Sequence, residues 1–304
     1  MDVRTDLALE LRDRAVKNSK KKIDGIDCYT CREHDCEINK ILIKNKTGAK
    51  LIGRPMGRYI TFEFGRVGVA DTEKFTDICE IIVKELTEMI ENKCPVFPKR
   101  VLVACLGNAD ISADALGPLT SKSIIVTSHL KTVCPSLFES FGNVELMSLS
   151  LGVMAQTGLE SAEIIKSVAQ SVKPDIIIAV DALASSELSR LACTLQISDT
   201  GISPGSGIGN FRNSLNESSL GLPVFSIGVP TMVEISSLVS NALKLLEIEP
   251  RKDLVSALGK NGKLLVTPKD CAIIIADLAK LIGFAINKTF IKDLDYEEIA
   301  RLVN

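Results

Sequence analysis

The sequence predicts an α/β fold with a mostly parallel central sheet flanked by helices and an N-terminal antiparallel appendage. Three observations predict it. The runs Val101–Leu106 and Ile176–Val180 are continuous, apolar and rich in β-branched residues, as strands covered on both faces are. Candidate helices alternate with such runs in the second part of the chain. Nearer the N-terminus, Glu37–Lys44 and Arg58–Phe64 alternate apolar and polar residues, which indicates half-exposed antiparallel strands.

The composition is that of a globular protein with a substantial core. The chain has 304 residues, of which 46% are hydrophobic. Its 36 basic and 38 acidic residues leave a net charge of −2, which gives no electrostatic footprint for nucleic acid. The N-terminus lacks the apolar region of a secretory signal, and no apolar run reaches the length of a membrane span. We therefore expect a cytoplasmic protein that contacts neither nucleic acid nor a membrane directly.

Two helices and two strands are predicted in the N-terminal part. Helix-forming, largely basic residues predict a helix from Leu9 to about Lys22. The two alternating segments, Glu37–Lys44 and Arg58–Phe64, should then pair as antiparallel strands. Asp71-Thr-Glu-Lys begins a capped helix that runs to about Glu91, because its apolar residues recur every three to four positions.

Strand–loop–helix units follow. Besides the two buried strands, further strands are predicted at Leu191–Ile197 and Pro223–Val229. Helices are predicted at about 159–172, 231–247 and 268–288, with Thr267 as the N-cap of the last and Pro268 as its first residue. A final helix from Asp295 closes the chain.

The tripeptide Asp-Ala-Leu occurs twice, each time where an apolar run ends. One copy is Asp114–Leu116 and the other is Asp181–Leu183. In an α/β protein, ligands bind in the crevice beyond the carboxyl ends of the strands. Two carboxylates delivered to that crevice can share a proton and activate a water molecule between them. Asp114 and Asp181 are therefore the predicted catalytic pair.

Helix capping is the alternative role for each of these aspartates. Asp114 would cap a helix introduced by Leu116-Gly-Pro118, and Asp181 would cap one over Ala182–Leu191. Capping and catalysis are compatible. The recurrence of one tripeptide at the ends of two buried strands favours a site.

A Gly-rich loop, residues 201–210, is the second candidate for chemistry. Gly205, Ser206, Gly207 and Gly209 can expose backbone N–H groups and are the predicted oxyanion or substrate loop. The loop departs from the dinucleotide-binding fingerprint, and no Gly-Lys-Ser/Thr phosphate loop occurs. We expect it to line a cleft rather than to bind a nucleotide.

Cysteine and histidine offer two weaker candidates. Cys28, Cys31, His34 and Cys36 could supply four zinc ligands within nine residues. No second ligand pair follows downstream, so an exposed Cys-rich loop is the preferred interpretation. His129 has no nucleophile motif nearby, and we expect it to be a partly buried structural residue. The predicted site includes neither a metal nor a cofactor.

Many short segments match one known family, in family order, from residue 3 to about residue 290. They are Val3–Glu10, Gly57–Glu63, Asp71–Lys74, Leu106–Asn108, Asp114–Pro118, Gly152–Met154, Thr157–Glu160, Lys173–Asp175, Asp181–Ala184, Gln196–Asn210, Gly228–Thr231 and Val266–Lys269. In these motifs the chain resembles the germination proteases of spore-forming bacteria, which are endopeptidases that degrade small acid-soluble spore proteins.

The resemblance implies an atypical aspartic-type endopeptidase whose two essential aspartates are Asp114 and Asp181. It also implies a fold similar to hydrogenase-maturation proteases, a homotetramer in the spore core, and synthesis as a zymogen that cuts itself. On this chain the cut falls between Asp6 and Leu7, which separates a propeptide, residues 1–6, from a single peptidase domain, residues 7–304. The cut resembles cleavage of the spore proteins, after an acidic and before an apolar residue.

Four features depart from the family pattern. Ser128 and Ser186 stand where the family commonly has arginine, and the segment Glu247–Leu265 is shorter than usual. The Cys28–Cys36 cluster has no counterpart in the family pattern. These differences concern substrate subsites, assembly and regulation. They leave the aspartate pair in place.

Two other functions fit the same residues. The first is a metal-dependent peptidase of the hydrogenase-maturation type, with Asp114, Asp181 and His129 as ligands. The second is a non-enzymatic module that binds an anionic ligand at the Gly-rich loop.

Overall fold

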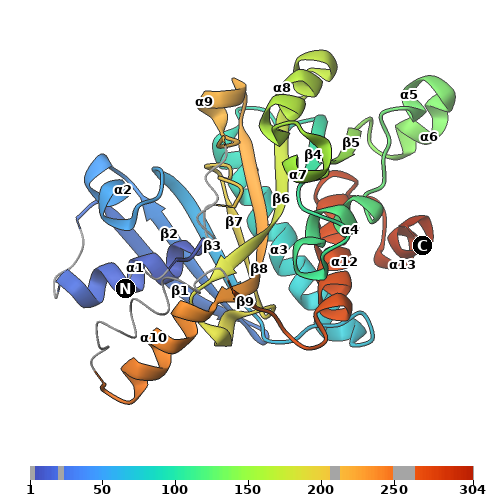
Figure 1. Cartoon of the computed structure of the whole chain (residues 1–304). Coiled ribbons are helices and arrows are strands. Elements are labelled where there is room, and N and C mark those ends of the chain that lie inside the picture. Colours follow the sequence, from blue (N-terminus) through green and yellow to red (C-terminus); the bar gives the residue numbers. More distant parts are fainter. Residues whose placement is uncertain (1–3, 20–23, 206–212, 249–263, 304) are drawn as a thin grey trace.

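The computed structural model of the chain describes residues 4–19, 24–205, 213–248 and 264–303 (Figure 1). Within these residues a single sheet of nine strands runs in the order β1-β2-β3-β7-β8-β6-β4-β5, with β9 beside β8. The strands are β1 Ile26–Glu33, β2 Cys36–Ile43, β3 Gly57–Glu63, β4 Arg100–Cys105, β5 Glu145–Ser150, β6 Ile176–Ser185, β7 Thr194–Ser198, β8 Val224–Glu234 and β9 Leu265–Val266.

The longer helices pack on both faces of this sheet, and short helices connect the strands. They are α1 Ala8–Ser19, α2 Lys46–Ile52, α3 Thr72–Lys93, α4 Leu116–Lys122, α5 Leu130–Val133, α6 Pro135–Ser140, α7 Met154–Thr157, α8 Ser161–Val172, α9 Glu217–Leu220, α10 Ile235–Leu245, α12 Cys271–Phe290 and α13 Tyr296–Val303. Single 3₁₀ turns lie at η1 Ser112–Asp114 and η2 Leu188–Arg190. No helix in the described part of the chain has the length and apolar character needed to cross a membrane.

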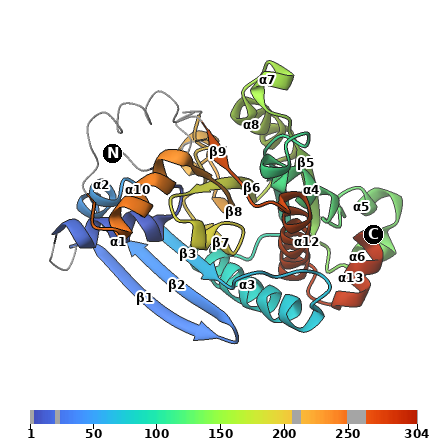
Figure 2. The same cartoon turned by 60° about the horizontal axis from the view of Figure 1, so that its bottom comes forward.

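The sheet has two halves. Strands β8, β6, β4 and β5 are parallel and form what we call the parallel half. Strands β1, β2, β3 and β7 pair antiparallel and form the antiparallel half, which joins the parallel half where β7 pairs antiparallel with β8. Figure 2 shows β1, β2 and β3 side by side in the antiparallel half.

The predicted α/β class, with a central sheet flanked by helices, is confirmed. The sheet is mixed rather than mostly parallel, and the antiparallel strands extend it instead of forming an appendage. The reason is the pairing of β3 with β7 over Tyr59–Glu63 and Thr194–Ser198, which inserts the N-terminal strands into the hydrogen-bonded ladder. The alternation of apolar and polar residues indicates that one face of each strand is more exposed than the other. It does not indicate which strand is the pairing partner.

Alternating residues of the buried strands feed two separate hydrophobic layers. Val101 and Val103 pack with α3 and α12 on one face, whereas Leu102 and Ala104 pack with α8 on the other. Helices α1 and α2 cover Ile41 and neighbouring apolar residues of the antiparallel half. This alternation explains why β4 reads as a continuous apolar run, since both of its faces are covered.

The predicted helices α3 and α12 are confirmed, but only α3 has the predicted cap. Helix α3 begins after Asp71, whose carboxylate accepts a hydrogen bond from the Lys74 N–H at 3.4 Å. Helix α12 begins three residues later than predicted, with Asp270 rather than Thr267 at the N-cap position. The predicted Cys-rich loop is instead strand β1 and its hairpin with β2, in which Cys28 pairs with Ile41.

Strand β6 is five residues longer than its apolar run. Its neighbour β4 ends at Cys105, opposite Val180, and the Leu106 N–H donates to the Val180 carbonyl at 2.8 Å. Beyond that point β6 continues to Ser185 beside β8 alone. The segment 181–185 therefore has one paired edge, against β8, and one edge that no strand of the sheet covers.

Strand β8 contains a β-bulge opposite this extension. Leu183 pairs with Pro230 and Ala184 with Met232, so that Thr231 is the extra residue. Proline has no N–H to donate to a central ladder, which accounts for an irregularity at this point. Bulges are frequent beside active sites because they redirect side chains.

Candidate active site

Asp181 lies inside β6, at the first residue past the end of β4, and not at a strand end as predicted. Its side chain is buried, and its Oδ1 accepts a hydrogen bond from the following N–H, that of Ala182, at 2.9 Å. The chain continues as strand β6 to Ser185, so no helix begins at Asp181 and the helix-capping role for this residue is wrong. The carboxylate instead lies beside the backbone of the next residue, on the edge of β6 that no strand covers.

Asp114 comes from the loop that fills the space beyond β4. It ends η1, is half-buried, and its Oδ2 accepts a hydrogen bond from the Asn108 N–H at 2.9 Å. The following helix α4 has Ala115 at its N-cap position and no side-chain cap, so capping is not the role of Asp114 either. The loop is tight at Gly107, where φ is +120° and a Cβ would collide with the Asp114 carbonyl oxygen.

The two aspartates line one cavity of about 80 Å³. Asp6 lines it too, as does Gly205 at the start of the predicted oxyanion loop. Ser206, Gly207 and Gly209 of that loop lie outside the described residues. The residues predicted from the two Asp-Ala-Leu tripeptides and from the N-terminus therefore meet at one place, beyond the carboxyl end of β4 and beside the last residues of β6.

The N-terminal segment occupies the uncovered edge of β6. The Asp6 N–H donates to the Ala184 carbonyl at 2.8 Å, and the Ala184 N–H donates to Asp6 Oδ2 at 2.9 Å. Thr5 adds a longer hydrogen bond from its Oγ1 to the same carbonyl, at 3.4 Å. The chain before the predicted cut thus lies against the edge of β6, joined to it by one main-chain hydrogen bond and by two hydrogen bonds of side chains.

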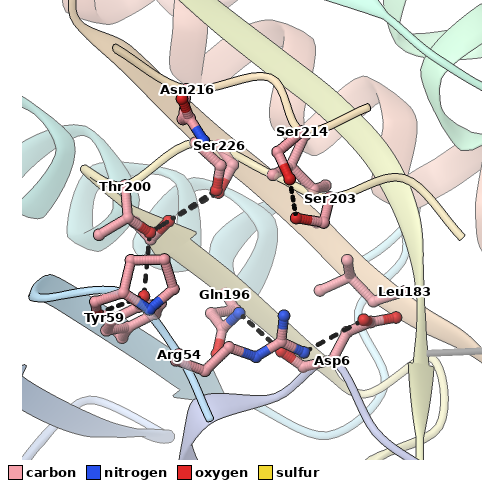
Figure 3. A pocket seen from close by; sticks show the side chains of 15 residues that line it. Asp6, Arg54, Tyr59, Leu183, Gln196, Thr200, Ser203, Ser214, Asn216 and Ser226 are labelled. Carbon is pink, nitrogen blue, oxygen red and sulfur yellow. Dashed lines mark hydrogen bonds and ion pairs between the residues drawn. The ribbon is translucent and has the colours of Figure 1, made fainter. Parts of the chain in front are cut away.

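Arg54, in the connection between α2 and β3, holds the other side of this segment. Its Nη2 donates to the Thr5 carbonyl at 3.0 Å and to Asp6 Oδ1 at 3.2 Å. Both side chains of the ion pair are largely buried, with 18% exposure for Arg54 and 11% for Asp6. Figure 3 shows the guanidinium of Arg54 and the amide of Gln196 both directed at Asp6.

Gln196 of β7 contacts both sides of the Asp6–Leu7 bond. Its Nε2 donates to the Asp6 carbonyl at 3.4 Å, and its Oε1 accepts from the Ala8 N–H at 2.8 Å. Leu7 between them is completely buried. The side-chain amide therefore spans the predicted scissile peptide.

Glu10 fixes the start of α1 to the end of β6. Its carboxylate is 1% exposed and accepts hydrogen bonds from the Ser185 hydroxyl at 2.6 Å, from the Ser186 N–H at 2.8 Å and from the Ser186 hydroxyl. Arg190 lies 3.6 Å from the same carboxylate. Ser186, one of the departures from the family pattern, is thus a partner of the helix that follows the cut.

Sequence reasoning missed Arg54, Gln196 and Glu10 as members of this site. Gln196 and Glu10 lie inside the matched segments, but nothing local to either residue marks it as a neighbour of the Asp6–Leu7 bond. Arg54 lies outside those segments. Their role appears only when β3 and β7 are brought against the N-terminal segment.

The weaker candidates do not join the site. His129 is exposed at the N-cap position of α5, not partly buried as predicted, and it does not line the cavity with Asp114 and Asp181. Cys28 and Cys31 are three residues apart in a strand, so their side chains point to opposite faces. Among the described residues, no group of three or more His, Cys, Asp or Glu side chains has the arrangement of a metal site.

A cavity beyond the end of a parallel strand, lined by two carboxylates and by a residue of an N-terminal segment, has the layout of a peptide-binding enzyme site. The family model described as "Germination protease" matches residues 3–250. The germination protease of Clostridium acetobutylicum is 34% identical, with 99% of each chain covered. That of Caldanaerobacter subterraneus subsp. tengcongensis is 35% identical, over 100% of this chain and 99% of its own. That of Priestia megaterium is 38% identical over 80% and 67%.

The chain belongs to the germination protease family, and it is therefore an endopeptidase of spore germination. Among solved structures, the [NiFe] hydrogenase maturation protease HycI from Thermococcus kodakarensis KOD1 is 17% identical, with a TM-score of 0.32, over 62% of this chain and 93% of that chain. The fold class rests on the sheet and helices described above.

Proposed function

We propose that this chain is the zymogen of an aspartic-type endopeptidase that begins the degradation of small acid-soluble spore proteins, and that it activates itself by cutting Asp6–Leu7. One observation carries the proposal: Asp6, at the predicted cut, lines the same cavity as Asp114 and Asp181. A substrate segment and two carboxylates at one cavity are what self-cleavage requires.

The proposed reaction is the hydrolysis of a peptide by water. One ionised carboxylate takes a proton from water, and the oxygen of that water bonds to the Asp6 carbonyl carbon. The other carboxyl group, protonated at the start, donates its proton to the Leu7 nitrogen as the carbon–nitrogen bond breaks. Either aspartate can be the base. Two carboxylates that face one small cavity share a proton readily because they do not both ionise easily.

Charge that develops on the carbonyl oxygen needs a hydrogen-bond donor. Gln196 Nε2, 3.4 Å from the Asp6 carbonyl oxygen, is the donor that we assign to this role. Catalytic hydrogen bonds are often long in the resting state and shorten in the transition state. Gly205 lines the cavity of Asp114 and Asp181. It is the residue of the predicted oxyanion loop that supports a second donor, from the backbone.

In this scheme residues 1–6 are a propeptide and residues 7–304 the peptidase. Before cleavage, Thr5 and Asp6 occupy the edge of β6 on which an external substrate would have to lie. The propeptide would thus block the site it is cut by. The homotetramer and the spore-core location that the resemblance implies belong to the same proposal.

Self-cleavage of the purified full-length chain tests the proposal. Intact mass measured over time should show loss of residues 1–6 from the unaltered protein. Asp114→Asn and Asp181→Asn should each slow this loss by about 1000-fold or more. Asp110→Asn is the matched control, because Asp110 lies in the same loop as Asp114 with its side chain toward Gln156. Retention of self-cleavage in both Asp114→Asn and Asp181→Asn would rule out the aspartate pair.

A second measurement tests the substrate. A peptide with a spore-protein cleavage sequence, incubated with processed protein, should be cut between an acidic and an apolar residue. Processing without any cleavage of the peptide would confine the activity to the chain itself.

A further inference from the structure

We propose that Arg54 and the Ala184 N–H form the subsite that selects the residue before the cut bond, and that substrates reach it by adding a strand to the uncovered edge of β6. The proposal rests on the proposed function and names the specificity-determining residue of that site. The ligand class is an extended peptide with a carboxylate side chain immediately before the cut.

The edge is available because of the unequal lengths of β4 and β6. The Val180 carbonyl points toward β4, where it accepts from Leu106. Residues two apart on a strand present their peptide groups to the same edge, so those of Ala182 and Ala184 face the space beyond the end of β4. Recognition by strand addition uses such main-chain groups for affinity and side-chain pockets for specificity.

The main-chain groups of Ala182 and Ala184 on this edge have different partners. The Ala182 N–H is taken by the Asp181 carboxylate, which keeps the catalytic group on the edge. Both the N–H and the carbonyl of Ala184 go to Asp6, the carbonyl to its main chain and the N–H to its side chain. Ala184 therefore fixes the position of the residue whose carbonyl is attacked and also contacts its carboxylate.

Arg54 supplies the charge that makes this pocket selective. Among the described residues, Asp6 is the only carboxylate that forms an ion pair with Arg54. The guanidinium is largely buried, and its Nε is a buried donor without a hydrogen-bond partner. A neutral residue in the pocket would leave a buried cation unpaired, and a basic residue would add repulsion. A glutamate, one methylene longer than Asp6, can reach further along the guanidinium toward Nε.

The experiment exchanges the charges of positions 6 and 54 in the full-length chain and follows self-cleavage by intact mass. Asp6→Glu should be cut at a rate similar to the unaltered chain. Asp6→Lys and Arg54→Glu should each be cut at least about 30-fold more slowly, the smaller end of the effect of unpairing a buried charge pair. The double variant Arg54→Glu with Asp6→Lys should recover at least 10-fold over either single variant, roughly one log unit of a charge-pair coupling.

Recovery separates recognition from a merely structural role, because a damaged fold is not repaired by a second charge change. If Asp6→Lys is cut as fast as the unaltered chain, or if the double variant is no faster than the faster single one, the proposal is wrong. Failure of the proposed function looks different: no variant is cut, including the unaltered chain.

A readout independent of cleavage covers that case. In the Asp114→Asn background, hydrogen exchange of the Ala184 amide reports whether Asp6 occupies the pocket. Protection should be high with Asp6 and Arg54 present and should drop at least about 10-fold in Asp6→Ala and in Arg54→Glu. Equal exchange in all three proteins would overturn the subsite even if self-cleavage never occurs.

Discussion

The parallel and antiparallel halves of the sheet contribute different things to the surroundings of Asp6, which lines one cavity with Asp114 and Asp181 and a second cavity with Arg54 and Gln196. The parallel half supplies both carboxylates, Asp181 from β6 and Asp114 from the loop after β4. Each is held by a backbone N–H a few residues away in the sequence. The antiparallel half supplies Gln196 from β7 and, just before β3, Arg54, and both contact the segment that holds the proposed cut.

The comparison shows that the two carboxylates come from one half of the sheet, whereas the side chains that position the Asp6 segment come from the other. The carboxylates depend on local backbone geometry, so they should be sensitive to small changes in their loops. The segment around Asp6 depends on side chains that come from residues 48 and 190 positions away. Changes in the antiparallel half should alter which peptide is held, and how well, more than they alter the carboxylates.

Apart from changes to the two aspartates themselves, Gly107→Ala should have the largest effect, because it displaces the loop of the parallel half at its tightest point. A Cβ at this residue would collide with the Asp114 carbonyl oxygen, and φ of +120° is unfavourable for alanine. A displacement of about 1 Å at a catalytic group can cost about 100-fold in rate, so self-cleavage should fall by at least that factor.

Gly221→Ala is the matched control for this change. Gly221 also has a positive φ, +76°, but a Cβ there would have no neighbour within 4 Å. It should lose about 1 kcal/mol of stability from backbone strain and keep its rate of self-cleavage. Equal rates in the two alanine variants would mean that the Asp114 loop tolerates displacement.

Gln196→Glu tests the antiparallel-half contribution. The carboxylate can still accept the hydrogen bond from the Ala8 N–H, but it cannot donate to the Asp6 carbonyl. We expect self-cleavage to slow by about 100-fold at most, because the resting contact is long. Gln196→Ala removes both contacts, and comparison of the two rates divides the effect between holding the chain and stabilising the oxyanion. A rate in Gln196→Glu equal to that of the unaltered chain would exclude the donor role.

The sequence predicted the parallel half better than the antiparallel half, and the reason is physical. A run such as Val101–Leu106 is apolar because both faces are covered, so its residues alone indicate a buried strand. In β1, most side chains are exposed and polar, and the pattern of Cys28, Cys31 and Cys36 was interpreted as a loop. An edge strand with one weakly buried face carries little pattern of its own.

The site was predictable only where its residues follow the chain. Asp181 is indicated by the apolar run that it directly follows, Asp114 by the same tripeptide in the loop after another apolar run, and Asp6 by the family resemblance. Arg54 and Gln196 are not, since their function depends on the register between β3 and β7 and on the course of the N-terminal segment. That register is a property of the assembled sheet.

Glu10→Gln tests the connection that crosses between the halves, where α1 is attached to the end of β6. The buried carboxylate accepts three hydrogen bonds from Ser185 and Ser186. An amide group presents an N–H₂ to some of these donors, and the loss should be about 2 kcal/mol of unfolding free energy. Urea unfolding measures it. Glu297→Gln, which removes an exposed ion pair with Arg301, should have no measurable effect. Equal stability of the two variants would mean that α1 is held by its apolar contacts alone.

Two buried thiols, one in each half, test the comparison through the pH dependence of stability, which is the smallest of the expected effects. Cys105 ends β4 and Cys36 begins β2, and neither is accessible to solvent. Burial raises the pKa of each thiol from 9.0 to about 12. Between these values the unfolded chain has lost the proton and the native protein keeps it. Stability should therefore be unaffected by these thiols below pH 9 and should fall as the pH rises above it, by up to about 1.4 kcal/mol per pH unit for each thiol.

Cys105→Ala and Cys36→Ala should each remove the contribution of one thiol to the fall of the unfolding free energy between pH 9 and 10.5. Each should also lower the unfolding free energy at neutral pH by about 1 kcal/mol, because the substitution leaves a small cavity. Denaturant unfolding at a series of pH values measures both. Because β7 and β8 join the halves into one ladder, the two variants should lose the same slope from a single transition. Two separate transitions, each sensitive to only one of the thiols, would mean that the half that holds the peptide unfolds independently of the half that carries the aspartates.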